Sequence, residues 1–235
     1  MKQLVLDIGV AAGPTMENFL VAGNRQAWQH IQGMLDAPAQ PATPVYLWGE
    51  QGTGKSHLLR AAVQALGNAG ARVGWMDAGV ADPGAFDEAW DAVALDDVHR
   101  YDARQQAAAF NWFINAGNPA SGAARLVLAA GRLPPADLPL REDLRSRLGW
   151  GHVFRLEALH EAQCRQVLQR QAAQRGIALS AEVLEYMRAH FARDLGSQMR
   201  LLERLDRFAL RTQRLITLAL LRAMLQDEPI AAETP

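Results

Sequence analysis

Short, mainly apolar runs alternate with stretches of helical periodicity along most of the chain. A mainly apolar run of about four to eight residues is typical of a strand buried on both faces of a parallel sheet. We expect such strands at residues 45–48, 72–76, 92–95, 126–130 and 153–156. Apolar residues three or four positions apart predict helices at residues 24–35, 55–66, 86–90 and 103–116.

Beyond residue 156 the pattern is helical only, with helices expected at residues 161–175, 181–191, 197–210 and 218–225. Ser180 is a predicted N-cap, and Gly176 is a predicted helix end. The fold class is therefore α/β, with a parallel-sheet domain followed by a small all-helical domain. The expected divisions are an N-terminal peptide at 1–12, the α/β domain at 13–157, the helical domain at 158–226 and a disordered tail at 227–235.

The composition permits a large core and disfavours a strong DNA binder. Hydrophobic residues make up 49% of the 235 positions, and 24 basic residues against 25 acidic ones give a net charge of −1. Autonomous duplex binding usually requires a basic excess, so we expect no strong sequence-specific DNA binding. The single cysteine fits a reducing compartment, and the longest apolar stretch is too short to span a bilayer. We expect a cytoplasmic protein with no membrane partner.

Residues 49–56 read Gly-Glu-Gln-Gly-Thr-Gly-Lys-Ser and match the phosphate-binding loop pattern in full, after a predicted strand and before a predicted helix. Glycines allow backbone N–H groups to face phosphate oxygens, and the helix N-terminus adds partial positive charge. We expect Lys55 to reach the β- and γ-phosphates and Ser56 to bind Mg²⁺. The expected nucleotide-binding residues here are Gly49, Gly52, Thr53, Gly54, Lys55, Ser56 and His57.

Two acidic residues follow the predicted strand at 92–95. In phosphate-binding-loop proteins an acid at such a strand end holds Mg²⁺. We expect Asp96 to bind the metal and Asp97 to orient or polarise a water molecule. Without the loop the pair could equally be solvated turn residues, but the intact loop favours the functional interpretation.

Several segments resemble the DnaA-related family of AAA+ ATPases. Asp-Asp-Val-His at 96–99 resembles its Walker B motif, and 144–151 resembles its Box VII, which ends in Ser-Arg-x-x-Trp-Gly. Asn-Phe-Leu-Val at 18–21, followed by Asn24, resembles the stretch that cups adenine, and the segment around Arg200 resembles the sensor II helix of the lid. The resemblance implies an AAA+ domain with a helical lid that binds ADP or ATP with Mg²⁺.

The same resemblance implies individual roles. Phe19 and Asn24 would contact the adenine, and Arg200 would reach the phosphates from the lid. Arg147 would be an arginine finger inserted into a neighbouring subunit's site, with Arg145 a weaker candidate. The ordinary alternatives are a solvated helix residue for Arg200 and a salt bridge to Asp143 or Glu142 for Arg147.

The layout is similar to the Hda branch of this family, whose members regulate the initiator DnaA and have no further DNA-binding domain. Residues 3–8 read Gln-Leu-Val-Leu-Asp-Ile, which fits a sliding-clamp-binding peptide with contacts from Gln3, Leu4, Leu6 and Ile8. An N-terminal strand would show the same alternation. The implied partners are DnaA and the DNA-loaded polymerase III β clamp, and a homodimer stays open.

The implied function is negative regulation of replication initiation, with Arg147 promoting hydrolysis of the ATP bound to DnaA. The alternative is a stand-alone AAA+ ATPase, of the helicase-loader or transposition-helper type, acting on single-stranded DNA. One departure from the family bears on this choice, because Gly131 stands at the sensor I position, where a polar residue is usual. We therefore expect weak or no autonomous ATPase activity.

Overall fold

The protein divides into two compact units in a computed structural model that describes residues 13–37, 43–118, 124–192 and 194–227. The first unit is Gly13–Ala158, and the second begins at Leu159. The predicted clamp-binding peptide and residues 228–235 of the predicted tail lie outside the described residues.

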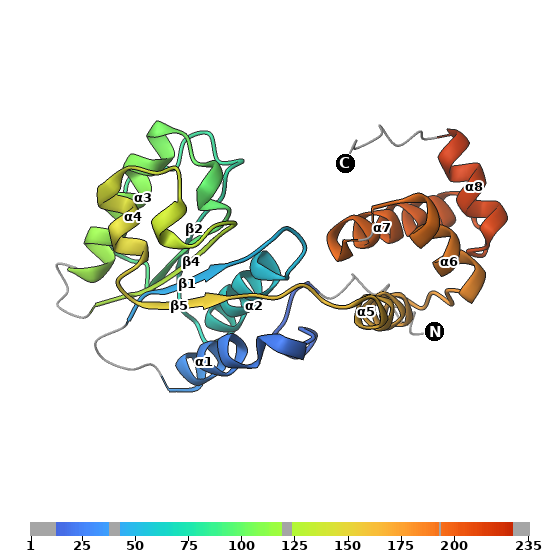
Figure 1. The fold of residues 1–235 in the computed structure, drawn as a ribbon, viewed down its shortest axis with the longest axis horizontal. Helices are drawn as coiled ribbons and strands as arrows, with labels where there is room; N and C mark the ends of the chain where they lie inside the picture. The colour runs from blue at the N-terminus through green and yellow to red at the C-terminus, as the bar shows by residue number, and fades with distance from the viewer. Residues whose placement is uncertain (1–12, 38–42, 119–123, 193, 228–235) are drawn as a thin grey trace, which may run out of the picture. The chain divides into compact units, whose positions relative to one another are not determined.

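A five-stranded parallel sheet forms the centre of the first unit (Figure 1). The strands lie in the order β2-β3-β4-β1-β5. Their bounds are Val45–Trp48 for β1, Val73–Met76 for β2, Ala92–Leu95 for β3, Leu126–Gly131 for β4 and His152–Arg155 for β5. Strand β4 therefore separates β1 from β3, and the carboxyl ends of all three strands meet at one edge of the sheet.

Helices cover both faces of this sheet (Figure 1). Helices α1 (Arg25–Asp36) and α2 (Lys55–Asn68) pack on one face, where Val45 and Leu47 are buried. Helices α3 (Ala103–Gly117) and α4 (Glu142–Leu148) pack on the other face, where Tyr46 is buried. Because successive strand residues face opposite sides, an apolar strand such as β1 stabilises both layers.

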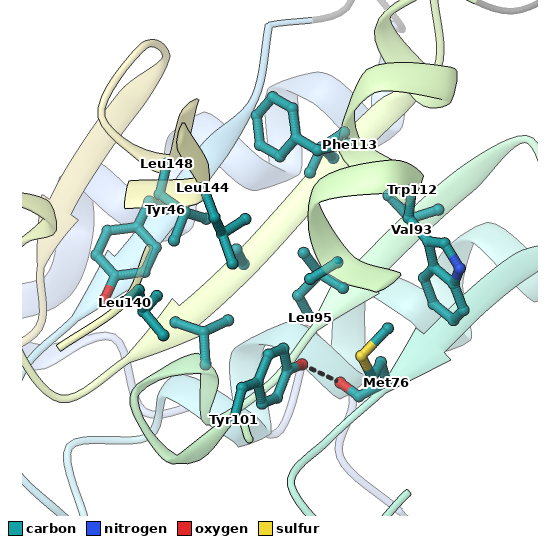
Figure 2. Close-up of a cluster of buried hydrophobic side chains, with 14 of the residues drawn as sticks. Tyr46, Met76, Val93, Leu95, Tyr101, Trp112, Phe113, Leu140, Leu144 and Leu148 are labelled. Carbon is teal, nitrogen blue, oxygen red and sulfur yellow. Dashed lines mark hydrogen bonds between the residues drawn. The ribbon is translucent and has the colours of Figure 1, made fainter. Parts of the chain in front are cut away.

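The core on the α3 and α4 side is the one drawn in Figure 2. Leu144 and Leu148, four residues apart on α4, point inward beside Tyr46, whereas the Tyr101 hydroxyl donates a 2.8 Å hydrogen bond to the Met76 carbonyl. Burying each leucine contributes about 1.5–3 kcal/mol. This anchorage fixes α4, which was not among the helices expected from the sequence. Short 3₁₀ helices at Ala22–Asn24, Val98–Arg100 and Pro135–Asp137 complete the unit.

The helix expected at residues 86–90 is wrong. These residues form a turn, in which the Asp87 carboxylate accepts from the backbone N–H of Ala89 at 2.8 Å and the Asp87 carbonyl accepts from that of Trp90. Such a side-chain bond competes with helix formation. The turn places the Trp90 ring against Gly74 and 4.6 Å from the Trp112 ring. The spacing of the apolar residues in this segment therefore reflects contacts with other elements and not a helix face.

The second unit is all helical, as the sequence predicts. It contains α5 (Glu161–Gln174), α6 (Ala181–His190), α7 (Leu195–Thr212) and α8 (Leu218–Asp227), packed around one apolar cluster. The predicted N-cap is confirmed, because the Ser180 hydroxyl accepts from the backbone N–H of Val183. Gly176 has a φ of +71° after α5, a conformation that glycine adopts without strain. Across the described ranges, no helix combines the length and apolar character needed to cross a bilayer.

Candidate functional site

A glycine-rich loop joins β1 to α2 and forms a cradle that only glycines allow. Gly49, Gly52 and Gly54 all have φ between +78° and +151°. A Cβ at Gly49 would lie 2.4 Å from the Leu156 carbonyl oxygen, and one at Gly54 would lie 3.0 Å from the Phe19 ring. The predicted phosphate loop therefore has the strand–loop–helix setting that its motif requires, with Lys55 as the first residue of α2.

The Lys55 ammonium lies within this loop. It donates to the carbonyls of Gly49 at 2.8 Å and Glu50 at 2.7 Å, and lies 3.3 Å from the Thr53 hydroxyl. Burial lowers the pKa of Lys55, although the carboxylates of Asp97 and Asp96 act in the opposite direction. A cation at the N-terminus of a helix, beside a glycine-rich loop, is suited to binding an anion there.

The predicted metal ligands lie together. The Ser56 hydroxyl donates to Asp96 Oδ1 at 3.0 Å, although the two residues are 40 positions apart. Asp96 is 2% exposed, and burial raises its pKa against the effect of the Ser56 hydrogen bond. The next residue, Asp97, adopts a left-handed conformation with a φ of +53° and donates its backbone N–H to Asp96 Oδ1. Aspartate tolerates this conformation better than most residues.

The structure explains the glycine at the sensor I position. A Cβ at Gly131 would lie 2.3 Å from the Tyr46 hydroxyl oxygen and 3.0 Å from Val98. That hydroxyl donates a 2.7 Å hydrogen bond to the Leu133 carbonyl. The tyrosine of β1 therefore occupies the volume that a side chain at residue 131 would need.

We expect Gly131→Ala to lower the free energy of unfolding by about 1–3 kcal/mol, because the added methyl group overpacks the buried contact with Tyr46. The double variant with Tyr46→Phe should lose less than the sum of the two single losses, because the clashing hydroxyl is gone. Urea unfolding measures both values. Gly67→Ala on α2 is the matched control, because nothing lies within 4 Å of its added Cβ. Additive losses in the double variant would contradict the proposed clash.

An arginine directly after β4 reaches the phosphate loop. The Arg132 guanidinium donates from Nε at 3.2 Å and from its terminal nitrogen at 3.0 Å to one carboxylate oxygen of Glu50. Local sequence patterns do not reveal this pair, because its members are 82 residues apart. Predicting this pair would require knowing the order of the strands, in which β4 lies next to β1.

Residues before α1 pack against the start of α2. The Phe19 ring lies 5.7 Å from the His57 ring, and His57 Nε2 lies 2.8 Å from the side-chain oxygen of Asn18. The Asn18 amide nitrogen donates to the Gly13 carbonyl, so its oxygen is the acceptor and His57 donates from Nε2. Burial lowers the pKa of His57, which keeps the ring neutral at pH 7. Phe19 and His57 thus lie together beside the loop, and their contact with a nucleotide stays a prediction.

Asn24 makes a paired contact that the sequence does not reveal. Its side chain accepts from the Glu157 backbone N–H at 2.7 Å and donates to the Glu157 carbonyl at 3.1 Å. Both hydrogen-bonding groups of the amide are therefore used by the chain just after β5. This arrangement gives Asn24 a structural role at the rim of the first unit, in addition to the adenine contact expected from the sequence.

Helix α4 carries the half-buried Arg147 beside its buried leucines, Leu144 and Leu148. The Arg147 guanidinium carbon lies 3.9 Å from the centroid of the Trp150 ring, and Trp150 is 65% exposed. The alternative, a salt bridge from Arg147 to Asp143 or Glu142, is not found among the described residues, and Asp143 pairs with Arg141 instead. Within the described residues, Arg147 forms no ion pair and its side chain makes no hydrogen bond. The half-buried Arg145 lies on the same helix.

Arg200 lies on α7 in the second unit, where its guanidinium donates to the Ser197 hydroxyl at 2.8 Å. Its predicted contact with phosphates would join the two units and stays a prediction. The clamp-binding residues Gln3, Leu4, Leu6 and Ile8 lie outside the described residues. Among the residues described, no cluster of three or more histidine, cysteine, aspartate or glutamate side chains could hold a metal ion. A metal at Ser56 and Asp96 would need further ligands from a nucleotide and water, which is usual for Mg²⁺.

Two family models match the chain, each over part of its length. The bacterial DnaA ATPase domain matches residues 12–79, and the lid domain of Hda matches residues 161–225. An uncharacterized protein of Haemophilus influenzae is 31% identical over 234 residues, which cover 95% of this chain and 98% of that protein.

Solved structures show the same fold. Domain III of DnaA from Thermotoga maritima superposes with a TM-score of 0.71 at 19% identity, over 91% of this chain and 95% of that one. AMPPCP-bound DnaA from Aquifex aeolicus has a TM-score of 0.62 at 22% identity, over 91% of this chain and 68% of that one. The α/β domain and the helical lid expected from the sequence are thereby confirmed.

Proposed function

Because this chain belongs to the DnaA-related AAA+ family, we propose that it binds an adenine nucleotide and acts on a partner DnaA as a negative regulator of replication initiation. The nucleotide would promote the conformation in which the chain acts, while the hydrolysis it stimulates takes place in the partner. Hydrolysis in the partner's site agrees with the sensor I position of this chain, where Gly131 has no side chain to orient a water molecule and the Tyr46 hydroxyl fills the space.

The residues of the loop fit ADP or ATP with Mg²⁺. The glycine cradle leaves no room for Cβ atoms, the Lys55 ammonium is poised beneath it, and the Ser56–Asp96 pair provides the oxygen ligands that Mg²⁺ prefers. We assign Lys55 to the β- and γ-phosphates and Ser56 and Asp96 to the metal. Phe19 and His57 would border the base, and Asp97 would face the metal and its water.

The arrangement of Arg147 is the observation that carries the regulatory role. Leu144 and Leu148 anchor α4 in the core, and the guanidinium of Arg147 stacks on the Trp150 ring. An arginine stacked on an aromatic ring keeps its charge and its planar fork available for oxygens. We assign Arg147 to the terminal phosphate of ATP bound to DnaA, where an arginine finger stabilises the charge that develops during hydrolysis.

Placement on DNA would come from the segment at residues 3–8. Its leucines and isoleucine supply apolar anchors for a groove on the sliding clamp, and Gln3 supplies a directional hydrogen bond. Clamp loaded on DNA would then bring Arg147 close to DnaA only where replication has begun.

A reconstituted hydrolysis assay tests this function. ATP hydrolysis by DnaA is measured with and without this protein, and with and without β clamp loaded on DNA. We expect stimulation only when the protein, the clamp and the DNA are all present. Turnover by this protein without DnaA, stimulated by single-stranded DNA, would instead indicate a stand-alone ATPase and would contradict the regulatory role.

We expect Gln3→Ala combined with Leu4→Ala to abolish clamp binding, because it removes the hydrogen bond and one apolar anchor of the peptide. Surface plasmon resonance on immobilised clamp measures the loss. The variant should keep the nucleotide affinity and melting temperature of the unmodified protein, which shows that the fold is intact. Clamp binding equal to that of the unmodified protein would remove the peptide from the proposal.

A further inference from the structure

The end of strand β4 lies between the two halves of the candidate nucleotide site. β4 pairs with β1, which leads into the phosphate loop, and with β3, which leads to Asp96. Because the strands are parallel, residues that follow β4 emerge at the same edge as both motifs. Arg132 is the first residue beyond this strand.

The residue before Arg132 cannot supply a polar group. Gly131 is buried, and the Tyr46 hydroxyl fills the place of its Cβ. The next side chain to leave the strand is therefore the first one able to reach the site from β4, and it is an arginine.

Arg132 is held at the phosphate loop by an ion pair with Glu50 that can be exchanged for another partner. Its two nitrogens donate to one oxygen of Glu50, while the side chains of Arg132 and Glu50 are 56% and 72% exposed. Such exposed pairs contribute little to stability, so the guanidinium can change partners at small cost.

We propose that Arg132 is a ligand of the terminal phosphate of a nucleoside triphosphate bound to this chain, and that Glu50 holds the guanidinium when that phosphate is absent. The inference rests on the proposed nucleotide binding and extends it to a preference between nucleotides. A terminal phosphate offers more negative charge and more acceptor oxygens than the Glu50 carboxylate, so the guanidinium exchanges one for the other. A nucleoside diphosphate leaves Arg132 on Glu50.

The two partners of this contact therefore have opposite effects on triphosphate affinity. Arg132→Ala removes a phosphate ligand, and we expect it to weaken AMPPCP binding about tenfold while ADP affinity changes little. Glu50→Gln removes the competing carboxylate, and we expect AMPPCP binding to strengthen by a factor of about two to five. Arg132→Lys keeps the charge but loses the planar fork, so its AMPPCP affinity should be intermediate.

Isothermal titration calorimetry with AMPPCP and with ADP, each with Mg²⁺, measures these affinities on the full chain. Arg72→Ala is the matched control, because Arg72 forms a comparable exposed pair with Asp87 at 3.1 Å before β2, at the opposite edge of the sheet. It should change neither affinity. Thermal unfolding of each variant shows whether the fold is retained.

Equal losses of AMPPCP and ADP affinity in Arg132→Ala would overturn the inference, because they indicate a structural role. Unchanged AMPPCP affinity in Arg132→Ala would overturn it as well. If Lys55→Ala loses both nucleotides while Arg132→Ala keeps both, the nucleotide site stands and only the role of Arg132 fails. Failure of the unmodified protein to bind either nucleotide would overturn this inference together with the proposed nucleotide site.

Discussion

Replacing Arg147 by alanine is expected to lower the stimulation of DnaA hydrolysis by a factor on the order of 10³ or more, the range found for arginine fingers. The expectation follows from the position of the side chain. α4 is held by its buried leucines, and Arg147 stacks on Trp150 instead of pairing with the acidic residues of its own helix. Removing the guanidinium should leave the fold and the nucleotide affinity unchanged.

The matched control is Arg145→Ala, on the same short helix and similarly half-buried. The Arg145→Ala protein should keep most of the stimulation. Trp150→Ala should cause a partial loss of stimulation, because the guanidinium of Arg147 then lacks the ring on which it stacks. The comparison is made at saturating clamp and DNA, so that weak docking does not mimic lost catalysis. Full stimulation by the Arg147→Ala protein would remove the finger from the mechanism.

Local sequence signals predicted the parts of the site that are contiguous in the chain. The phosphate loop needs glycines at fixed spacing between a buried strand and a helix, and both the glycines and their setting are readable in residues 45–66. The strands were predicted to within a residue at each end. Four of them are apolar because the sheet is covered on both faces, whereas the edge strand β5 includes His152 and Arg155 and is mostly exposed. Ser56 and Asp96 were both expected to bind the metal, because Ser56 ends the phosphate-loop motif and Asp96 directly follows a predicted strand.

Contacts between distant segments could not be predicted in this way. Asn24 and Glu157 are 133 residues apart, and Arg132 and Glu50 are 82 residues apart. Hydrophobic periodicity shows which face of an element is buried but not which strand lies beside it. Only the order of the strands, with β4 next to β1, brings the end of β4 to the phosphate loop.

The two errors in the helix predictions have physical causes of the same kind. At residues 86–90 the apolar side chains face neighbouring aromatic rings, and the Asp87 carboxylate stabilises a turn. At α4 the stretch is rich in charge, so its two inward leucines gave too weak a pattern to indicate a helix. Tertiary contacts decide both cases, which is the usual limit of local propensity.

We expect Lys55→Ala to weaken binding of both ATP and ADP by a factor on the order of 10² or more, because it removes a buried, charge-assisted contact to the phosphates. The ammonium lies at the loop and donates to the carbonyls of Gly49 and Glu50, and it would exchange these acceptors for phosphate oxygens when a nucleotide binds. Calorimetry with Mg²⁺ present measures the loss, and the Gly67→Ala protein provides a folded reference with an unaltered loop. Unchanged affinity for both nucleotides would show that they bind elsewhere. A loss confined to ATP would instead mean that Lys55 contacts only the terminal phosphate, which would reassign the β-phosphate to the backbone of the loop.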